Sequence, residues 1–137
     1  MMKILMLMLL MVSMNVSAEW TNVGGNVDDT RTVYVDFETL RKKDNNTKIW
    51  VLMDFKTVNQ IKNVKILTMI NRFEYNCNEE TVRQLDFYLY SGNMGSGEIV
   101  FSQTNIKNEP QSMLPNSMNE NVFKITCGKK GLFCIDC

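Results

Sequence analysis

The sequence predicts an α+β domain in which an antiparallel β-sheet of about five or six strands carries a C-terminal α-helix on one face. Three observations support this prediction. Several runs alternate apolar and polar residues with the period of two that is typical of half-buried strands. Two of these runs flank a glycine-rich turn at residues 91–97, as in a β-hairpin with a longer loop. The last periodic segment, residues 117–127, changes to the spacing of an amphipathic helix.

The first 18 residues are predicted to be a secretory signal peptide, with a buried N-terminal helix as the alternative. Met1-Met2-Lys3 is a short basic start, and residues 4–12 form an unbroken apolar run. Val16-Ser17-Ala18 has the small or branched residues of a cleavage site. We therefore expect residues 19–137 to be exported to the periplasm or secreted. Because no cysteine precedes Cys77, we expect them not to be lipid-anchored.

The remaining chain is nearly neutral and lacks histidine, which restricts the classes of function. Cleavage would remove Lys3 and no acid, leaving 14 basic and 15 acidic residues and a net charge of about −1. This balance argues against nucleic acid as a partner. The absence of histidine excludes Ser-His-Asp and Cys-His catalysis and any histidine-ligated metal. We therefore predict no enzymatic activity and no cofactor.

The first half of the domain is predicted to contain two strands joined by a polar turn. Residues 33–37 alternate cleanly and follow an extended segment. Residues 38–41 are expected to bend away, and residues 42–47 to form the turn. The second strand covers residues 48–58, and the apolar Trp50 and Leu52 on its second face suggest a central strand.

The third strand leads into the hairpin. Residues 59–63 are a polar break, and residues 64–77 form a long strand whose pattern switches face near residues 68–71, as a β-bulge would cause. The hairpin strands cover residues 81–90 and 98–103. Three apolar residues of its first strand are expected to be buried on the sheet face that meets the helix: Leu85, Phe87 and Leu89.

The C-terminal helix has recognisable ends. Ser117 and Glu120 match a capping box, in which the serine accepts a hydrogen bond from the glutamate N–H. The apolar stripe at i, i+4 and i+7 consists of Met118, Val122 and Ile125. The helix is expected to end at Cys127, because Gly128 follows the last periodic residue.

Four cysteines in an exported chain predict disulfides, and they allow three pairings: Cys77, Cys127, Cys134 and Cys137. The last two have the Cys-x-x-Cys spacing of redox proteins, but the chain ends there without the helix that lowers a thiol pKa. We predict a local structural disulfide for this pair, with a redox or metal-binding role as the alternative.

Five residues are candidates for binding a partner. Arg41, Lys42 and Lys43 form a basic run beside a turn, which is either a solvated loop or a contact for an acidic partner. Tyr88 and Tyr90 share the otherwise polar face of the hairpin strand; they are either an interaction surface, since tyrosine is common at interfaces, or are covered by the helix or a neighbouring strand. The turn at residues 41–47 and the loop at residues 92–97 are the predicted contact surface, because loops on a rigid scaffold carry recognition.

Several short motifs occur in the order and spacing of a known family. They are Trp20, Tyr34-Val35-Asp36, Leu40-Arg41-Lys42, Trp50-Val51-Leu52, Asp54-Phe55-Lys56, Glu74-Tyr75-Asn76-Cys77, Arg83-Gln84-Leu85, the segment at residues 90–97, and Pro115-Asn116-Ser117. Residues 20–128 thereby resemble the surface-adhesin protein E-like domains of Gram-negative bacteria. The resemblance implies an antiparallel sheet with a packed helix, and a disulfide between Cys77 and Cys127.

The resemblance also implies a function. Its naming member adheres to host extracellular-matrix proteins, so we expect a non-catalytic protein-binding role for this exported chain. The alternatives are a periplasmic accessory protein that binds another envelope component and, ranked last, a small redox or hydrolytic enzyme. A homodimer is a further alternative. Residues 19–137 are expected to form a single domain, with a core at residues 20–128 and a short tail.

Overall fold

The computed structural model of this 137-residue chain describes residues 18–25 and 30–128. Residues 1–17 of the predicted signal peptide and the tail with Cys134 and Cys137 lie outside these ranges, so those two predictions stay untested. The elements are β1 (Thr21–Gly25), β2 (Arg31–Lys43), β3 (Asn46–Ile61), β4 (Val64–Asn76), β5 (Thr81–Tyr90), the 3-10 helix η1 (Asn93–Gly95), β6 (Ile99–Gln103), β7 (Gln111–Ser112) and α1 (Met118–Cys127).

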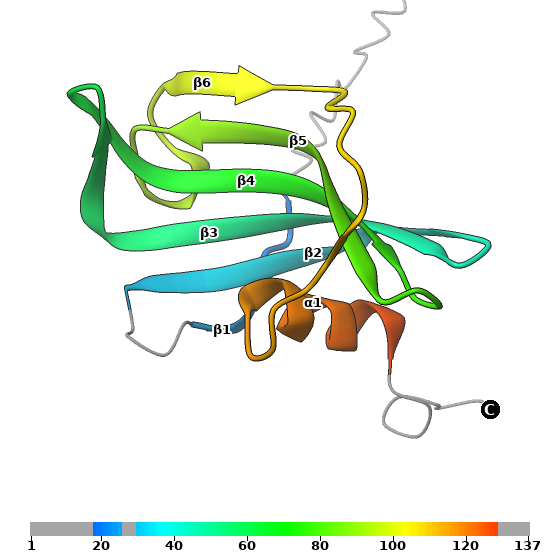
Figure 1. Ribbon diagram of the computed structural model, residues 1–137. Coiled ribbons are helices and arrows are strands. Elements are labelled where there is room, and N and C mark those ends of the chain that lie inside the picture. Colours follow the sequence, from blue (N-terminus) through cyan, green and yellow to red (C-terminus); the bar gives the residue numbers. More distant parts are fainter. Residues whose placement is uncertain (1–17, 26–29, 129–137) are drawn as a thin grey trace, which may run out of the picture.

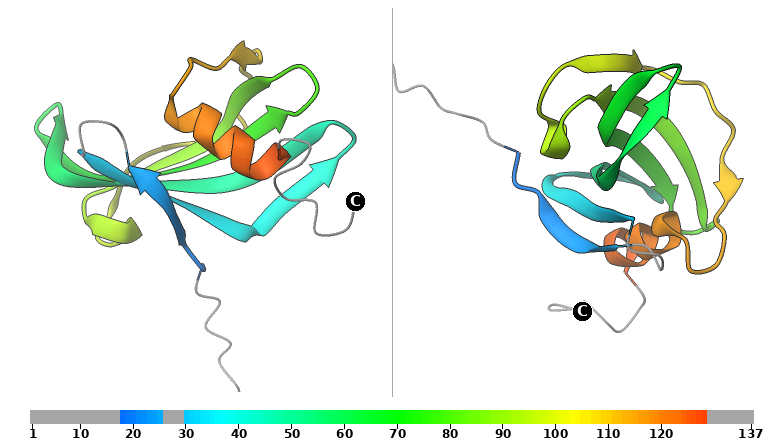
Figure 2. Two further views of the ribbon diagram at one scale, coloured as in Figure 1. Left: turned by 90° about the horizontal axis from the view of Figure 1, so that it is seen from below. Right: turned by 90° about the vertical axis from the view of Figure 1, so that its left-hand side faces the viewer.

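The strands form one antiparallel sheet in which each strand pairs with the next along the chain, in the order β1-β2-β3-β4-β5-β6. The short β7 pairs with the start of β5. Figure 1 shows the sheet as a twisted layer with α1 lying across one end of it, and Figure 2 shows how strongly the sheet curves around the helix. The predicted fold class is confirmed.

The second and third strands are longer than the sequence predicted. β2 continues through the expected bend to Lys43, but residues 37–40 are unpaired, and the register with β3 shifts between Asp36 and Arg41. β3 continues to Ile61, so the break expected over residues 59–63 is only a two-residue turn at Lys62 and Asn63. Both turn residues have positive φ, 50° and 65°, the conformation that joins strands tightly.

The β5–β6 hairpin is confirmed, but its alternation is interrupted. The buried residues of β4 switch from even to odd numbers between Thr68 and Asn71 as expected, but pairing with β5 is regular from Thr68 to Arg72, so the bulge predicted there is absent from this part of the strand. The shift lies between Arg72 and Phe73 and leaves Leu85 of β5 without a direct partner. Beyond this bulge the residues of β5 that face α1 change from even to odd numbers.

The helix begins and ends as the sequence predicted. The Ser117 side chain caps it by accepting a hydrogen bond of 3.2 Å from the Glu120 N–H, and it ends before Gly128, whose φ is 70°. The predicted disulfide between Cys77 and Cys127 is present, with 5.5 Å between the Cα atoms. It ties the end of α1 to the residue that follows β4. Among the described residues, no helix is long and apolar enough to span a membrane.

The core lies between α1 and the sheet face that it covers. Its buried members are Val33, Val35, Ile49, Val51, Met53, Phe73, Tyr75, Val82 and Val122. The expected contact between the β5 stripe and the helix is wrong in part, because Val82 at the start of β5 joins this cluster instead. Leu85 and Leu89 are buried, but Phe87 is only half-buried and pairs with the exposed Phe101, with 5.7 Å between ring centroids.

Candidate binding surface

The sheet face that α1 leaves uncovered carries a row of polar and aromatic side chains. In the register of the sheet, Trp50 lies between Asp36 and Arg72, and Arg72 lies opposite Asp86. Directly paired residues share a face, whereas successive residues of a strand alternate. The neighbours of Trp50 on β3 belong to the core, so this row projects from the opposite side. We call this side the polar face.

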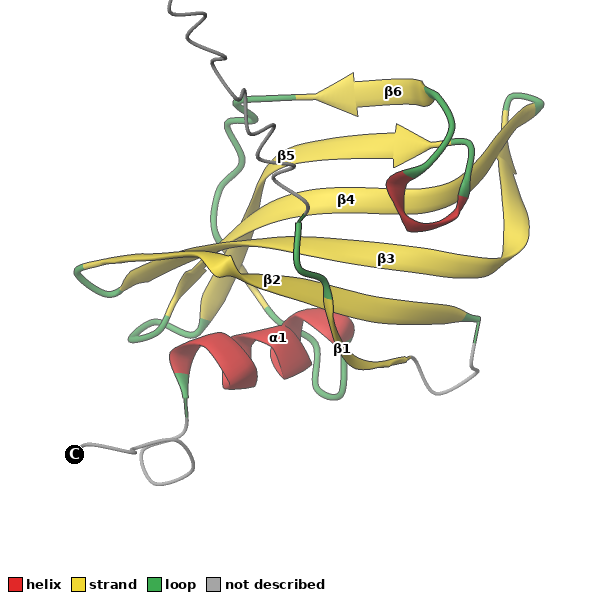
Figure 3. Ribbon diagram, turned by 180° about the vertical axis from the view of Figure 1, so that it is seen from behind, coloured by secondary structure: helices red, strands yellow, loops and turns green. Residues whose placement is uncertain are grey.

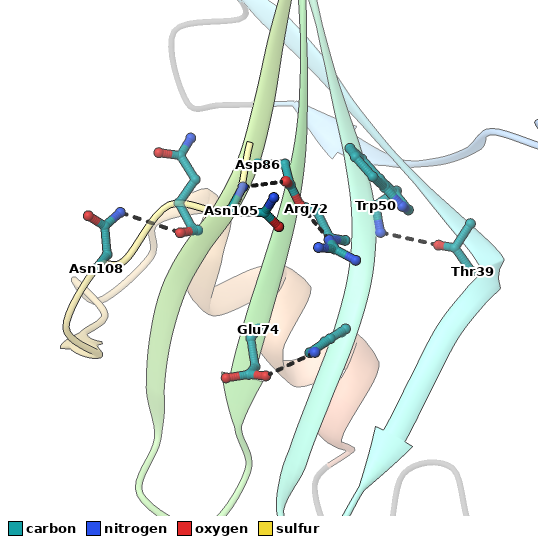
Figure 4. Close-up of polar contacts among 9 residues, drawn as sticks. Thr39, Trp50, Arg72, Glu74, Asp86, Asn105 and Asn108 are labelled. Carbon is teal, nitrogen blue, oxygen red and sulfur yellow. Dashed lines mark hydrogen bonds and ion pairs between the residues drawn. The ribbon is translucent and has the colours of Figure 1, made fainter. Parts of the chain in front are cut away.

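The centre of the polar face is a fixed cluster built around Arg72 (Figure 4). Its guanidinium carbon lies 5.7 Å from the ring centroid of Trp50, within the range of a cation–π contact. Its Nε donates a hydrogen bond of 2.5 Å to Asp86 Oδ2, and Asp86 Oδ1 accepts from the backbone N–H of Asn105 at 2.9 Å. The Tyr88 ring lies 6.1 Å from the Trp50 ring. These contacts hold the Arg72 side chain, which is 34% exposed, in one position.

A second row of charges lies next to this cluster. Glu74, whose side chain is 9% exposed, accepts a hydrogen bond of 2.7 Å from Arg83 Nε and lies 3.8 Å from Lys48 Nζ. One carboxylate therefore faces two cations. The imbalance leaves this end of the polar face with an excess of positive charge.

The basic run at the β2–β3 turn divides between the two sides of the sheet. The turn itself is Asp44 and Asn45, and Arg41, Lys42 and Lys43 pair across it with residues of β3. Because side chains alternate along a strand, Arg41 and Lys43 project on the polar face, and Lys42 projects on the opposite face of the sheet. The Arg41 guanidinium donates to the carbonyls of residues 38 and 40, both at 2.9 Å.

Two adjoining depressions connect the basic turn with the central cluster. The first has a volume of about 490 Å³, and its lining includes Asp36, Arg41, Lys48, Trp50 and Arg72. The second has a volume of about 520 Å³ and is lined by Arg41, Lys43, Asp44, Asn46, Lys48 and Glu74. The structure thus brings Arg41 to the depression that contains Trp50 and Arg72, places Lys43 in the adjoining depression, and leaves Lys42 outside both.

The two predicted tyrosines also share the polar face. Tyr88 lies opposite Ile70 and contacts Trp50, while Tyr90 lies opposite Thr68, further from the basic turn. Both side chains are half-buried.

The loop at residues 92–97 folds back over the far end of the polar face, where Figure 3 shows η1 lying across β4. The Asn93 side chain and the Met94 N–H donate to Asp54 Oδ1 at 3.1 and 2.9 Å, and the Gly95 N–H donates to Thr68 Oγ1 at 3.1 Å. Asp54 and the basic turn are about eight residues apart on β3, roughly 26 Å at about 3.3 Å per residue. The loop and the turn therefore bound the polar face at its two ends and do not form one continuous surface.

Sequence reasoning missed most of the central cluster. Trp50 indicated only a strand covered on both sides, and the strand acids showed no informative spacing. The cluster depends on the register of β3, β4 and β5, which brings together residues 36, 50, 72 and 86 from four strands. One signal of this cluster was available in the sequence. The period-two alternation of β3 places Trp50 on the same face as Lys48.

The comparisons with known proteins agree with this architecture. The sequence model of the family described as surface-adhesin protein E matches residues 20–128. A solved structure of Haemophilus influenzae protein E is similar, with 15% identity over 82% of this chain and 86% of that chain, and a TM-score of 0.57. A second crystal form of that protein has 14% identity over 82% and 90% of the two chains, with a TM-score of 0.55. No curated protein matches this chain in sequence.

Proposed function

This chain belongs to the surface-adhesin protein E family, and we propose on that premise that it is an exported, non-catalytic protein that binds a host extracellular-matrix protein through its polar face. The observation that carries the proposal is the fixed Trp50–Arg72–Asp86 cluster beside the basic end of β2. The similarity to the solved structures supports the fold only.

The composition of the polar face suits a protein partner. Tryptophan, tyrosine and arginine are enriched at the centres of protein interfaces, where they contribute most of the binding energy. Trp50, Arg72 and Tyr88 are already held by one another and by Asp86, so little side-chain freedom remains to be lost on binding. Arg41 and Lys43 lie at the edge of the same surface, where exposed charges mainly accelerate association with an acidic partner.

The alternation of the basic run supplies a matched pair of variants. Lys43→Glu reverses a charge that lines the second depression, and Lys42→Glu makes the same change on the opposite side of the strand. Against immobilised matrix proteins, we expect Lys43→Glu to weaken binding about three- to tenfold, mainly by slowing association, and higher salt to have the same effect. Lys42→Glu should bind like the wild type. Trp50→Ala should weaken binding more than either, by more than about tenfold.

Circular dichroism and thermal unfolding would verify that each variant is folded. Equal losses for Lys42→Glu and Lys43→Glu would contradict the assignment of the polar face. A purified protein that binds no matrix component and no envelope protein at micromolar concentration would contradict the proposed function, and turnover of an ester or disulfide substrate above background would favour an enzyme instead.

An envelope accessory role is the second candidate, because the aromatic and arginine side chains of the polar face suit an envelope protein as well as a matrix protein. The same face would then bind another envelope protein. Capture from envelope extracts by wild-type protein, compared with Lys43→Glu protein, would distinguish this partner from a matrix protein.

A further inference from the structure

Most of the exposed large apolar side chains gather at one end of the sheet, away from the basic turn. Eight such side chains occur in the described part of the chain, and five of them come from the β3–β4 hairpin, η1 and the start of β6. These five are Val58, Ile61, Val64, Met94 and Ile99, with exposed fractions between 42% and 56%. Figure 1 and Figure 3 show these three segments at the same end of the molecule.

The hairpin carries this apolar end beyond the rest of the sheet. Ile61 and Val64 are directly paired next to the two-residue turn, so their side chains share one face of the tip. The hydrogen bonds that the η1 loop makes to β3 and β4 reach as far as Phe55 and Thr68, several residues before the turn. We call residues 58–65 the hairpin tip.

The charged residues of the β3–β4 hairpin beyond Asp54 are all positive. Residues 55–67 contain Lys56, Lys62 and Lys65 and no acid, and all three lysines are exposed. This composition differs from that of the polar face. Protein interfaces are enriched in aromatic residues and arginine and depleted of lysine, whereas surfaces that dock on membranes combine aliphatic side chains with lysines near the phosphate groups.

We propose that the hairpin tip docks on the surface of an anionic phospholipid bilayer. Ile61 and Val64 enter the boundary between headgroups and acyl chains, and Lys62 and Lys65 bind lipid phosphates. A hairpin that approaches end-on presents both of its faces, so the lysines reach the surface together with the apolar pair. This docking uses the opposite end of the sheet from the basic turn, and it would leave the polar face open to a protein partner.

The proposal is tested by flotation of the exported protein with vesicles of phosphatidylcholine, with and without about one third phosphatidylglycerol. We expect the protein to float with the anionic vesicles and not with the neutral ones, and raised salt to reduce binding. The double variant Lys62→Glu with Lys65→Glu should reduce partitioning by more than about tenfold. Ile61→Ser with Val64→Ser should also reduce it, although the charge is unchanged.

Two control variants make the same kinds of substitution elsewhere in the chain. Lys42→Glu with Lys107→Glu alters the net charge equally at exposed positions outside the hairpin tip, and Leu114→Ser removes the most exposed apolar side chain of the described residues. Both should bind vesicles like the wild type. Equal loss in the charge control, or no binding of the wild type to anionic vesicles, would overturn the proposal. Hairpin-tip variants that bind vesicles normally but no longer capture a protein partner would also overturn the proposal. None of these results depends on whether the polar face binds a matrix protein.

Discussion

At the scale of the residue, Tyr75 joins the sheet to the helix most directly. Its side chain is fully buried, and its hydroxyl donates a hydrogen bond of 3.0 Å to Asn119 Oδ1 on α1. The rings of Phe73 and Phe123 lie 6.1 and 6.2 Å from its ring. Burial raises the pKa of the Tyr75 phenol well above its ordinary value of 10.0, so the phenol keeps its proton in the folded protein.

Replacing Tyr75 with phenylalanine should lower the free energy of unfolding by about 1–2 kcal/mol near neutral pH, because Asn119 loses its donor inside the protein. The contribution of Tyr75 to the free energy of unfolding should also depend on pH and should decrease as the pH rises. Above about pH 10 the phenol ionises in the unfolded chain but not in the folded one, so the unfolded state binds fewer protons and wild-type stability falls as pH rises. The contribution of Tyr75 is complete below that pH.

Urea unfolding of both proteins at about pH 8 and about pH 11 would measure this difference. The wild type should lose more stability between the two conditions than Tyr75→Phe, because the variant lacks the buried phenol. The other tyrosines and the lysines are common to both proteins and cancel in the comparison. Parallel losses would show that Tyr75 ionises as easily in the folded state as in the unfolded one.

At the scale of the element, two residues of the predicted apolar stripe of α1, Met118 and Val122, face the core as expected, but the third does not. Val122 is fully buried and Thr126 nearly so, while Met118 and Phe123 pack against the core from its edge. Ile125, the third member of the predicted stripe, is only half-buried. The disulfide at the last residue of the helix and the hydrogen bond from Tyr75 together set the rotation of the helix about its axis.

The rotation of α1 predicts unequal effects for two similar substitutions. Val122→Ala should lower the free energy of unfolding by about 2 kcal/mol, because it removes the equivalent of two fully buried methyl groups from the core. Ile125→Ala removes more atoms but should cost less than about 1 kcal/mol, because its site is partly solvated. Chemical denaturation of the two variants would measure both effects, and a larger loss for Ile125→Ala would mean that the helix is rotated toward the predicted stripe.

The bulge in β5 shows how one residue changes the faces of a strand. The strict alternation of residues 84–90 predicts that Gln84 shares a face with the tyrosines. In the structure, the Gln84 side chain donates a hydrogen bond of 2.6 Å to the buried Asn71 on the side that α1 covers. Leu85 absorbs the change, and Asp86 then projects on the polar face, where it holds Arg72. The bulge therefore decides that Arg83, and not Gln84, lies opposite Glu74 on the polar face.

At the scale of the whole molecule, the disulfide fixes the end of α1 to the start of the β4–β5 connection. Cys77 and Cys127 are separated by 50 residues, and the enclosed chain contains β5, β6, β7 and the helix. Closing a loop of that length lowers the entropy of the unfolded chain by the equivalent of about 4 kcal/mol in the chain-entropy model.

The double replacement Cys77→Ser with Cys127→Ser should lower the free energy of unfolding by about 2–5 kcal/mol and reduce the melting temperature clearly. Thermal unfolding of the variant and of the reduced wild type would measure the effect, and the two should agree. Mapping of non-reduced peptides provides the control, since Cys77 joined to Cys134 or Cys137 would contradict the pairing. A melting temperature unchanged by both treatments would show that packing alone holds the helix.

The sequence by itself determined the features that depend on residues close together in the chain. The alternation of strands, the glycine-rich hairpin turn, the Ser117 cap and the Gly128 terminus are set by local backbone preferences and short-range hydrogen bonds, and each was predicted. The paired cysteines and the family followed from motifs spread along the chain in a fixed order.

Only the tertiary structure decided which side chains meet across strands. A single bulged residue reverses the faces of a strand, and the partners of Trp50 and Arg72 depend on the register of strands that are distant in sequence. The opposite sides taken by Lys42 and Lys43, and the projection of the hairpin tip beyond the η1 loop, were decided in the same way, because they follow from where strands start and end against their neighbours.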